Sequence, residues 1–302
     1  MDTALLVGFL VAAVRVATPL LLAALGEAVS ERGGVINLGI EGAMLAGALG
    51  AALGATTGGP WMGVACSIGA GVLVSSAVAL VSVGAGANQI ITGTAVTLGT
   101  VGLTGAIYRQ AYGAAGVGLS LPTFPVLPVP LLSEIPFIGP ALFQQTVLTY
   151  LALVAVPALW WVLFRTAWGL RLRAAGESAE HARAAGVAVR RVRSEGVLIG
   201  GGFAGLAGAT LVLAQVGTFA ENMTAGRGFI AIAIVVLGSW RPGRIFGAAL
   251  FFGAAMALQF LLQSFALGVP YQVFLMVPYL LTLAVLAGAM GQGKPPADLG
   301  RG

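Results

Sequence analysis

Six polar side chains lie in or beside long apolar runs, where they could hydrogen-bond a polar solute: Asn37, Glu41, Asn88, Thr92, Gln215 and Asn222. An ionised group at membrane depth costs roughly 2.5–3.5 kcal/mol on insertion scales, so Glu41 is expected to face a cavity or a partner. One interpretation is a path for a solute that Asn37 and Glu41 line or support. The other is a brace, in which Glu41 pairs with Arg32 or with backbone amides and supports a broken helix.

The remaining polar groups allow the same two interpretations. Asn88 and Thr92 stand at helical spacing at the start of an apolar run. They could bind a ribose or a base, but threonine hydroxyls also bond to their own helix. Gln215 and Asn222 flank Glu221, which Arg227 could neutralise as a structural pair.

Catalytic chemistry is not indicated. The chain has no Gly-x-x-x-x-Gly-Lys-Ser/Thr phosphate loop, and its one lysine, Lys294, is near the C-terminus. The one histidine, His181, and the one cysteine, Cys66, are far apart, so no metal site is expected. We expect a protein that is not an enzyme and that needs no cofactor, and a single cysteine cannot form a disulfide within the chain.

A charged stretch, 165–195, interrupts the apolar runs and holds seven of the fifteen Lys/Arg residues against three acids. Within it, 179–185 is predicted to form a short helix about 10 Å long, with Ser178 as N-cap and Gly186 at its C-terminal end. Another protein could dock on such a helix. The alternative is a solvated loop that obeys the positive-inside rule.

The amino-acid composition is typical of a membrane protein. The 302 residues are 58% hydrophobic and 8% charged, whereas soluble domains have about 25% charged residues. The 46 glycines suit close helix–helix contact in lipid, and spacings such as Gly50–Gly54, Gly201–Gly205 and Gly243–Gly247 predict a compact bundle. The net charge of +5 comes mostly from one loop and reflects topology, so no nucleic-acid partner is expected.

The predicted fold is an all-α polytopic membrane protein with about nine transmembrane helices, within a range of eight to ten. The runs are 4–28, 35–55, 61–83, 89–109, 143–164, 196–217, 226–239, 244–267 and 270–290. The seventh run is short, and polar and glycine residues crowd the start of the second. Residues 1–290 are expected to form one permease domain, followed by a cytoplasmic tail, 291–302.

The Lys/Arg distribution orients these runs. With 165–195 inside, the basic turn at 239–244 and the tail also fall inside, and the N-terminus falls outside. The proline-rich loop 110–142 then lies outside and cannot be one regular helix. The N-terminus lacks a basic region, so no signal peptide is predicted. The stretches 33–39 and 226–238 share a weak glycine-rich pattern that suggests related halves.

The charged loop resembles the coupling loop of ABC-importer permeases for branched-chain amino acids, simple sugars and nucleosides. Gly169, Arg173-Ala174, Gly176-Glu177 and 184–187 carry the match, and Ala179 stands where many relatives have proline. The resemblance implies a cytoplasmic helix that seats in an ATPase subunit, with alanines inside and charged residues at the rim. The coupling residues it implies are Arg173, Gly176, Glu177, Glu180, Ala182, Arg183, Ala184, Ala185 and Gly186.

A second motif, 30–44, resembles the stretch that opens the second span of nucleoside-type permeases, with Asn37 and Glu41-Gly42 in place. The overall resemblance runs from Thr18 to Met290. It implies a permease subunit in a bacterial plasma membrane, working with an ATPase, an extracytoplasmic binding protein that meets the outer loop, and a second permease chain. Relatives of the nucleoside type often pair two different permease chains, which favours a heterodimer over a homodimer. Outside the resemblance, the outer loop could equally be a lid without a partner.

Three alternatives remain. The solute could be a simple sugar or a branched-chain amino acid. The chain could be an ion-coupled secondary transporter, but Glu41 is the one acid suited to a site at the midplane. An intramembrane enzyme is disfavoured because no nucleophile–base pair is found.

Overall fold

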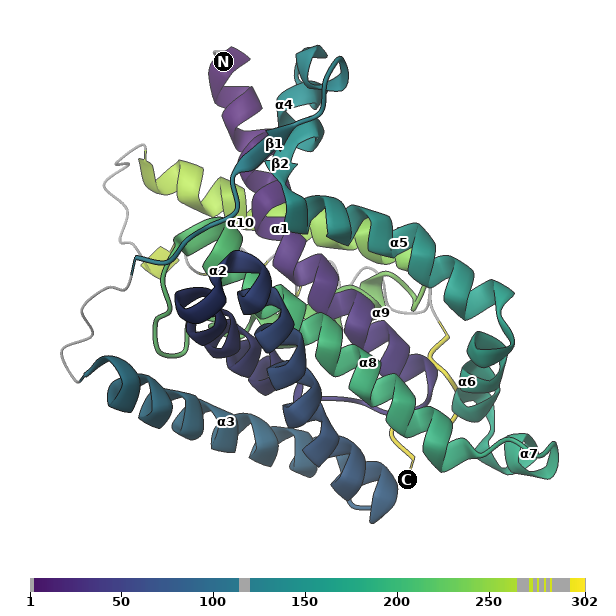
Figure 1. The fold of residues 1–302 in the computed structure, drawn as a ribbon. Coiled ribbons are helices and arrows are strands. Elements are labelled where there is room, and N and C mark those ends of the chain that lie inside the picture. Colours follow the sequence, from purple (N-terminus) through teal and green to yellow (C-terminus); the bar gives the residue numbers. More distant parts are fainter. Residues whose placement is uncertain are drawn as a thin grey trace.

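The computed structural model describes residues 3–113, 120–264 and 294–301, with isolated positions between 272 and 283. They form a helical bundle with one small antiparallel sheet (Figure 1). The long helices are α1 (Thr3–Arg32), α2 (Ile40–Val78), α3 (Gln89–Tyr112), α5 (Val147–Arg165), α8 (Val189–Thr210) and α10 (Pro242–Ser264). The shorter elements are β1 (Val126–Pro128), α4 (Ile138–Phe143), β2 (Gln144–Thr146), α6 (Ala167–Glu177), α7 (Ala179–Ala184) and α9 (Arg227–Leu237).

Six described helices are long and apolar enough to cross a membrane, and α9 is a shorter apolar helix. This confirms an all-α polytopic membrane fold. The element that continues from α2 to Gly84 contains two of the predicted runs, 35–55 and 61–83. The ninth predicted run, 270–290, lies outside the described residues apart from isolated positions.

The two runs within α2 form a hairpin. Gly58 and Gly59 leave helical geometry, and Gly59 has a φ of +79°, which glycine adopts without steric cost. Pro60 follows at the start of the second arm, where a missing N–H does no harm. The arms then pack against each other, since a Cβ on Gly54 would lie 2.8 Å from the Met62 carbonyl oxygen.

Glycines hold α2 and α8 in close backbone contact. A Cβ on Gly205 would lie 2.1 Å from the Ser67 carbonyl oxygen, and one on Gly47 would lie 2.4 Å from the Gly205 Cα. The small-residue spacings at 50–54 and 201–205 are thus confirmed as packing contacts. The third spacing differs, because a Cβ on Gly243 or Gly247 would meet no atom of the described chain within 4 Å.

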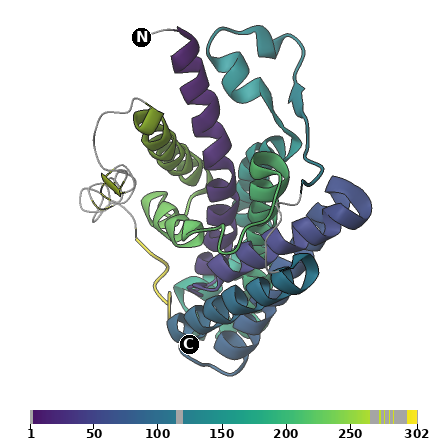
Figure 2. The same ribbon diagram turned by 90° about the vertical axis from the view of Figure 1, so that its left-hand side faces the viewer.

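The two ends of the bundle are different. The start of α1 lies beside the segment that holds β1, α4 and β2, whereas α6, α7 and the C-terminal segment lie at the opposite end (Figures 1 and 2). The sequence-based expectation that 110–142 and 165–195 face opposite sides agrees with this arrangement. The proline-rich loop is broken into short elements, as its prolines predicted.

Candidate translocation and coupling site

Glu41 joins the starts of two helices in the interior of the bundle. Its side chain is 3% exposed, and its two oxygens accept hydrogen bonds from Gly226 N at 2.8 Å and Gly228 N at 2.5 Å. A carboxylate is favourable there because the first N–H groups of a helix lack partners within the helix. Gly228 permits the contact, since a Cβ would lie 2.6 Å from the Glu41 Cα. Glu41 therefore caps α9, as the backbone-amide version of the brace predicted.

Arg32, the other partner considered for Glu41, is engaged elsewhere. Its Nε donates to the Trp240 carbonyl oxygen at 3.1 Å, and its guanidinium lies 5.7 Å from the centre of the Phe164 ring. Arg32 thus fixes the end of α1 against the turn after α9 and the end of α5.

The loop between α1 and α2 carries a buried polar group. The side chain of Asn37 is fully buried, and its backbone N–H donates to Glu27 Oε1 at 2.9 Å. Its side-chain amide has no hydrogen-bond partner among the described residues. One helical turn after Glu27, Glu31 accepts a hydrogen bond from Trp240 Nε1. Sequence reasoning missed both acids because they lie close to Arg32 at the end of α1, although their spacing of four places them on one face.

Asn88 caps α3, and Thr92 lies buried in the first turn of the same helix. Asn88 Oδ1 accepts hydrogen bonds from the backbone N–H groups of Ile90 and Ile91 at 3.0 and 3.1 Å, the geometry of an N-cap. Thr92 is 7% exposed. Thr94 donates to Ile90 O within its own helix. The capping role of Asn88 uses the side-chain oxygen that was expected to be available to a solute.

Gln215 and Asn222 lie at the other end of the bundle. Gln215 Nε2 donates to the Arg15 carbonyl oxygen at 2.6 Å, and Asn222 is an exposed loop residue with a φ of +56°. Glu221 forms an exposed ion pair with Arg109 at 3.0 Å, a partner that the sequence did not indicate. Gln89 and Arg190, at the start of α8, line the same cavity, so the neighbouring Asn88 lies near the start of α8. Gln215 follows the end of α8, so the two side chains are near opposite ends of that helix. The six candidate residues do not converge on one site.

The predicted coupling helix is present as α7, one residue shorter than expected. Ser178 Oγ accepts a hydrogen bond from His181 N at 3.3 Å, which confirms the N-cap. Ala185 follows the last residue of the helix, and Gly186 has a φ of +80°, as a glycine that ends a helix commonly does.

The coupling residues divide between an outer and an inner side. The outer, exposed set is Glu177, Glu180, Arg183, Ala184, Ala185 and Gly186. Ala182 belongs to the inner side, where it packs with Ala175, Ala179 and Val189, so it cannot be part of an exposed docking face.

Arg173 and Gly176 also contact the protein's own helices. Arg173 Nε donates to the Leu163 carbonyl oxygen at 3.0 Å, and its guanidinium lies 5.0 Å from the centre of the Phe164 ring. A Cβ on Gly176 would lie 2.2 Å from the Arg32 carbonyl oxygen. These two residues hold α6 against the ends of α5 and α1.

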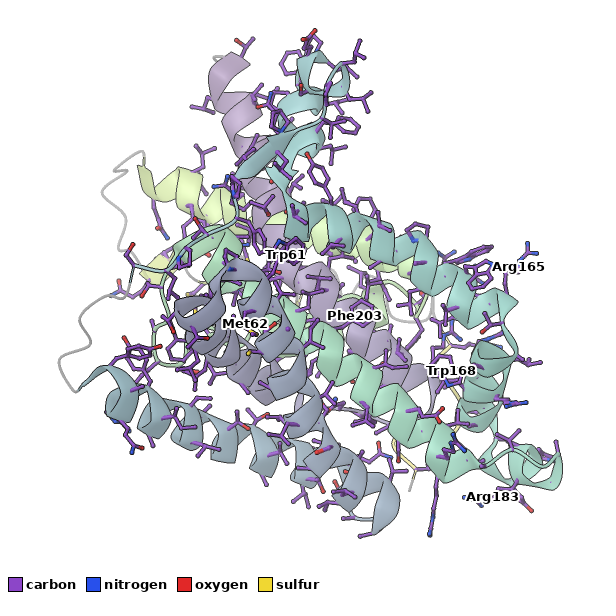
Figure 3. The ribbon with its side chains drawn as sticks, viewed as in Figure 1. Trp61, Met62, Arg165, Trp168, Arg183 and Phe203 are labelled. Carbon is purple, nitrogen blue, oxygen red and sulfur yellow. The ribbon has the colours of Figure 1, made fainter. Side chains whose placement is uncertain are left out.

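A cavity of about 490 Å³ lies beside the end of α7, and Gly186, Arg171 and Arg191 are among its lining residues. Glu195 on α8 holds two of the lining side chains in place, because it accepts hydrogen bonds from Trp168 Nε1 at 2.8 Å and Arg191 Nε at 2.9 Å. Trp168 and Arg183 lie at this end of the molecule, away from Trp61 and Met62 at the α2 hairpin (Figure 3). Ala185 and Gly186, which directly follow α7, belong to both the exposed side of the coupling segment and the lining of this cavity.

Apolar spanning helices together with a half-length apolar helix whose N-terminus is capped in the interior are features of membrane transporters. The chain belongs to the family described as the permease component of the branched-chain amino acid transport system, which matches residues 9–286.

Three curated relatives are matched over nearly their whole length and carry permease names. The chain is 41% identical to a putative glucose ABC transporter permease of Haloferax volcanii, over 94% of this chain and 92% of that protein. It is 35% identical to a guanosine ABC transporter permease of Bacillus subtilis, over 93% and 91% of the two chains. It is also 35% identical to a nucleoside ABC transporter permease of Lactococcus lactis, over 93% and 92%. No solved structure matches the chain significantly. The protein is thus a permease subunit of an ABC transporter.

Proposed function

We propose that the chain forms the translocation path of a nucleoside importer and couples it to a separate ATPase. The observation that carries the solute class is the 30–44 motif, which resembles nucleoside-type permeases, together with the guanosine and nucleoside permeases among its relatives. ATP binding and hydrolysis occur in the partner and move α7, and the permease itself performs no chemistry.

A continuous set of contacts supports a route from α7 to the interior. The helix α7 follows α6 after one residue, and Gly176 in α6 lies directly against the Arg32 carbonyl oxygen at the end of α1. The loop that follows Arg32 leads to Asn37 and Glu41, and Glu41 holds the start of α9. A displacement of α7 would therefore be transmitted through these packed backbone contacts to the start of α2 and the start of α9.

The exposed side of α7 is the surface that we assign to the ATPase. Glu177, Glu180 and Arg183 form its charged rim, and Ala184, Ala185 and Gly186 are small enough for close docking. Arg173, Gly176 and Ala182 position the helix from within.

We further propose that α7 and the C-terminal segment face the cytoplasm of a bacterial cell and that the membrane is crossed about nine times. The α2 hairpin contributes two of these passes. A second permease chain, preferably a different one, completes the path. A groove of about 600 Å³ between the start of α1 and the proline-rich segment suits contact with an extracytoplasmic binding protein.

Among the six polar candidates, the structure favours a supporting role for Glu41, Asn88 and Gln215, because their side chains bond to backbone groups. Asn37 and Thr92 stay proposals for the path: both are buried, and the side-chain amide of Asn37 lacks a partner in the described chain. Asn222 stays a proposed path residue, at the end of the bundle that we assign to the outside.

A sugar is the second candidate solute, because the relative at 41% identity is named as a putative glucose permease. The test is uptake of radiolabelled guanosine into proteoliposomes that contain the complete importer with ATP enclosed and the binding protein outside. We expect unlabelled adenosine to compete, and glucose and leucine to have no effect. Uptake of labelled glucose in place of guanosine would contradict the nucleoside assignment and support the sugar.

A further inference from the structure

The C-terminal segment, 294–301, is bonded to the start of the coupling helix. Asp298 Oδ2 accepts a hydrogen bond from the backbone N–H of Ala179, the first residue of α7, at 2.6 Å. In the other direction, the Asp298 backbone N–H donates to the carbonyl oxygen of Gly176 in α6 at 2.9 Å. One residue near the C-terminus thus bonds on both sides of the α6–α7 junction.

Arg193 of α8 fixes the same segment to the bundle. Its side chain is 6% exposed, and it donates to three carbonyl oxygens: Nε to Gly33 at 2.9 Å, Nη1 to Arg301 at 3.1 Å and Nη2 to Ala175 at 3.1 Å. Nη2 also lies 4.0 Å from Asp298 Oδ2. The planar guanidinium suits such multiple contacts. The α1–α2 loop, α6 and the C-terminal segment therefore meet at one buried cation.

Two more contacts place the segment on the α1–α2 loop. The Gly300 N–H donates to the Gly34 carbonyl oxygen at 3.1 Å. A Cβ on Gly300 would lie 3.2 Å from Ile36, and Leu299 packs against the main apolar cluster. The segment is thus seated between the coupling helix and the loop that leads to Glu41.

The coupling helix depends on contacts of this kind. It has six residues, and helices this short are unstable without tertiary contacts. Two of its first N–H groups have acceptors outside the helix: His181 N bonds to Ser178 Oγ, and Ala179 N bonds to Asp298. The Asp298 bond ties the N-terminus of α7 to a part of the chain 119 residues away.

We propose that Asp298 is a positioning residue for coupling: its carboxylate holds α7 against the α1–α2 loop, so that movement of α7 by the ATPase is transmitted to the interior. The proposal rests on the coupling role assigned to α7 above. Without the carboxylate, α7 can move without moving the loop, and ATP would be hydrolysed with less solute transported.

The variants are chosen to isolate that hydrogen bond. Asp298→Ala removes the acceptor, whereas Asp298→Asn keeps an oxygen for Ala179 N. Arg301→Ala is the matched control: its side chain is 78% exposed and lies 3.9 Å from Asp298 Oδ1, and the substitution leaves the backbone carbonyl oxygen that Arg193 needs.

Each variant is assembled with the ATPase, the second permease chain and the binding protein. In proteoliposomes, the number of solute molecules transported per ATP hydrolysed is measured, with guanosine or glucose as selected by the competition assay. Hydrogen exchange at 176–186 is measured on the same complexes without ATP. For Asp298→Ala we expect at least a threefold lower transport ratio, at least tenfold faster exchange at the start of α7, and a half-saturating solute concentration within twofold of the unsubstituted complex.

Asp298→Asn and Arg301→Ala should keep a ratio within twofold of the unsubstituted complex. An unchanged ratio in Asp298→Ala, or an equal loss in all three variants, would overturn the role of Asp298. If the unsubstituted complex transports solute without ATP hydrolysis, the proposed function itself fails. If it is coupled and Asp298→Ala is coupled equally, the positioning role alone fails.

Discussion

At the scale of single residues, Glu41 has the most clearly defined structural role. A carboxylate buried in a membrane bundle is costly unless its charge is compensated, and here two backbone N–H groups at the start of α9 compensate it. Its neighbour Gly42 belongs to the same close packing, since a Cβ there would lie 3.0 Å from the Thr97 Cα. The Glu-Gly pair of the 30–44 motif therefore has a physical reason: one residue caps a helix, and the other permits contact with α3.

Replacing Glu41 should destabilise the protein. Glu41→Ala leaves the N–H groups of Gly226 and Gly228 without their acceptor, and bonds to charged groups contribute roughly 1.5–3 kcal/mol each. Glu41→Gln keeps one acceptor oxygen and should lose less. The measurement is the midpoint of thermal unfolding in detergent. Glu221→Ala serves as the control, because exposed ion pairs contribute about 0–1 kcal/mol. Equal midpoints for Glu41→Ala and Glu221→Ala would refute the capping role.

At the scale of elements, the contact between α2 and α8 determines how rigid the bundle is. Gly205 lies between the two arms of α2, with the Gly47 backbone on one side and Ser67 on the other. Since apolar burial gives helices little reason to associate in lipid, such close packing supplies much of their attraction.

Gly205→Ala should therefore disturb the bundle, because overpacking of a tight site typically costs 1–3 kcal/mol. Gly202→Ala on the same helix is the matched control, since its nearest contact would be an ordinary 3.6 Å from Val72. Size-exclusion profiles and unfolding midpoints in detergent test the pair. The prediction fails if both variants behave like the unsubstituted chain.

The sequence predicted the elements well where composition decides them. Long apolar runs predicted where the spanning helices lie, although α8 begins at Val189, seven residues before the predicted run 196–217. The Ser178 and Gly186 caps predicted the bounds of α7 to within one residue. The partners of polar groups were harder to predict, because they are backbone atoms of distant segments. Glu221 pairs with Arg109, which is 112 residues away, and Glu41 reaches α9 across 185 residues. The burial of Ala182 was missed because exposure of a short helix depends on how α6 and α8 pack around it.

At the scale of the whole molecule, the opposite placement of the proline-rich segment and α7 predicts their topology. Cys66 is replaced by alanine, and single cysteines are introduced at the exposed positions Thr123 and Glu180. In intact cells, a membrane-impermeant maleimide should label the Thr123→Cys variant and should label the Glu180→Cys variant only after the membrane is opened. The reverse labelling pattern would invert the orientation.

The account's central claim is that an ATPase drives this permease through α7. The most direct measurement is ATP-dependent uptake by the complete importer carrying substitutions at Gly186, which has a φ of +80° and no neighbour within 4 Å of an added Cβ. Valine is strained in that backbone conformation, whereas asparagine tolerates it, so the two substitutions differ in local geometry. We predict that Gly186→Val loses at least tenfold in uptake and retains less of the ATPase on purification, while Gly186→Asn stays within threefold of the unsubstituted importer. Full ATP-dependent uptake and full ATPase retention by Gly186→Val would contradict the claim.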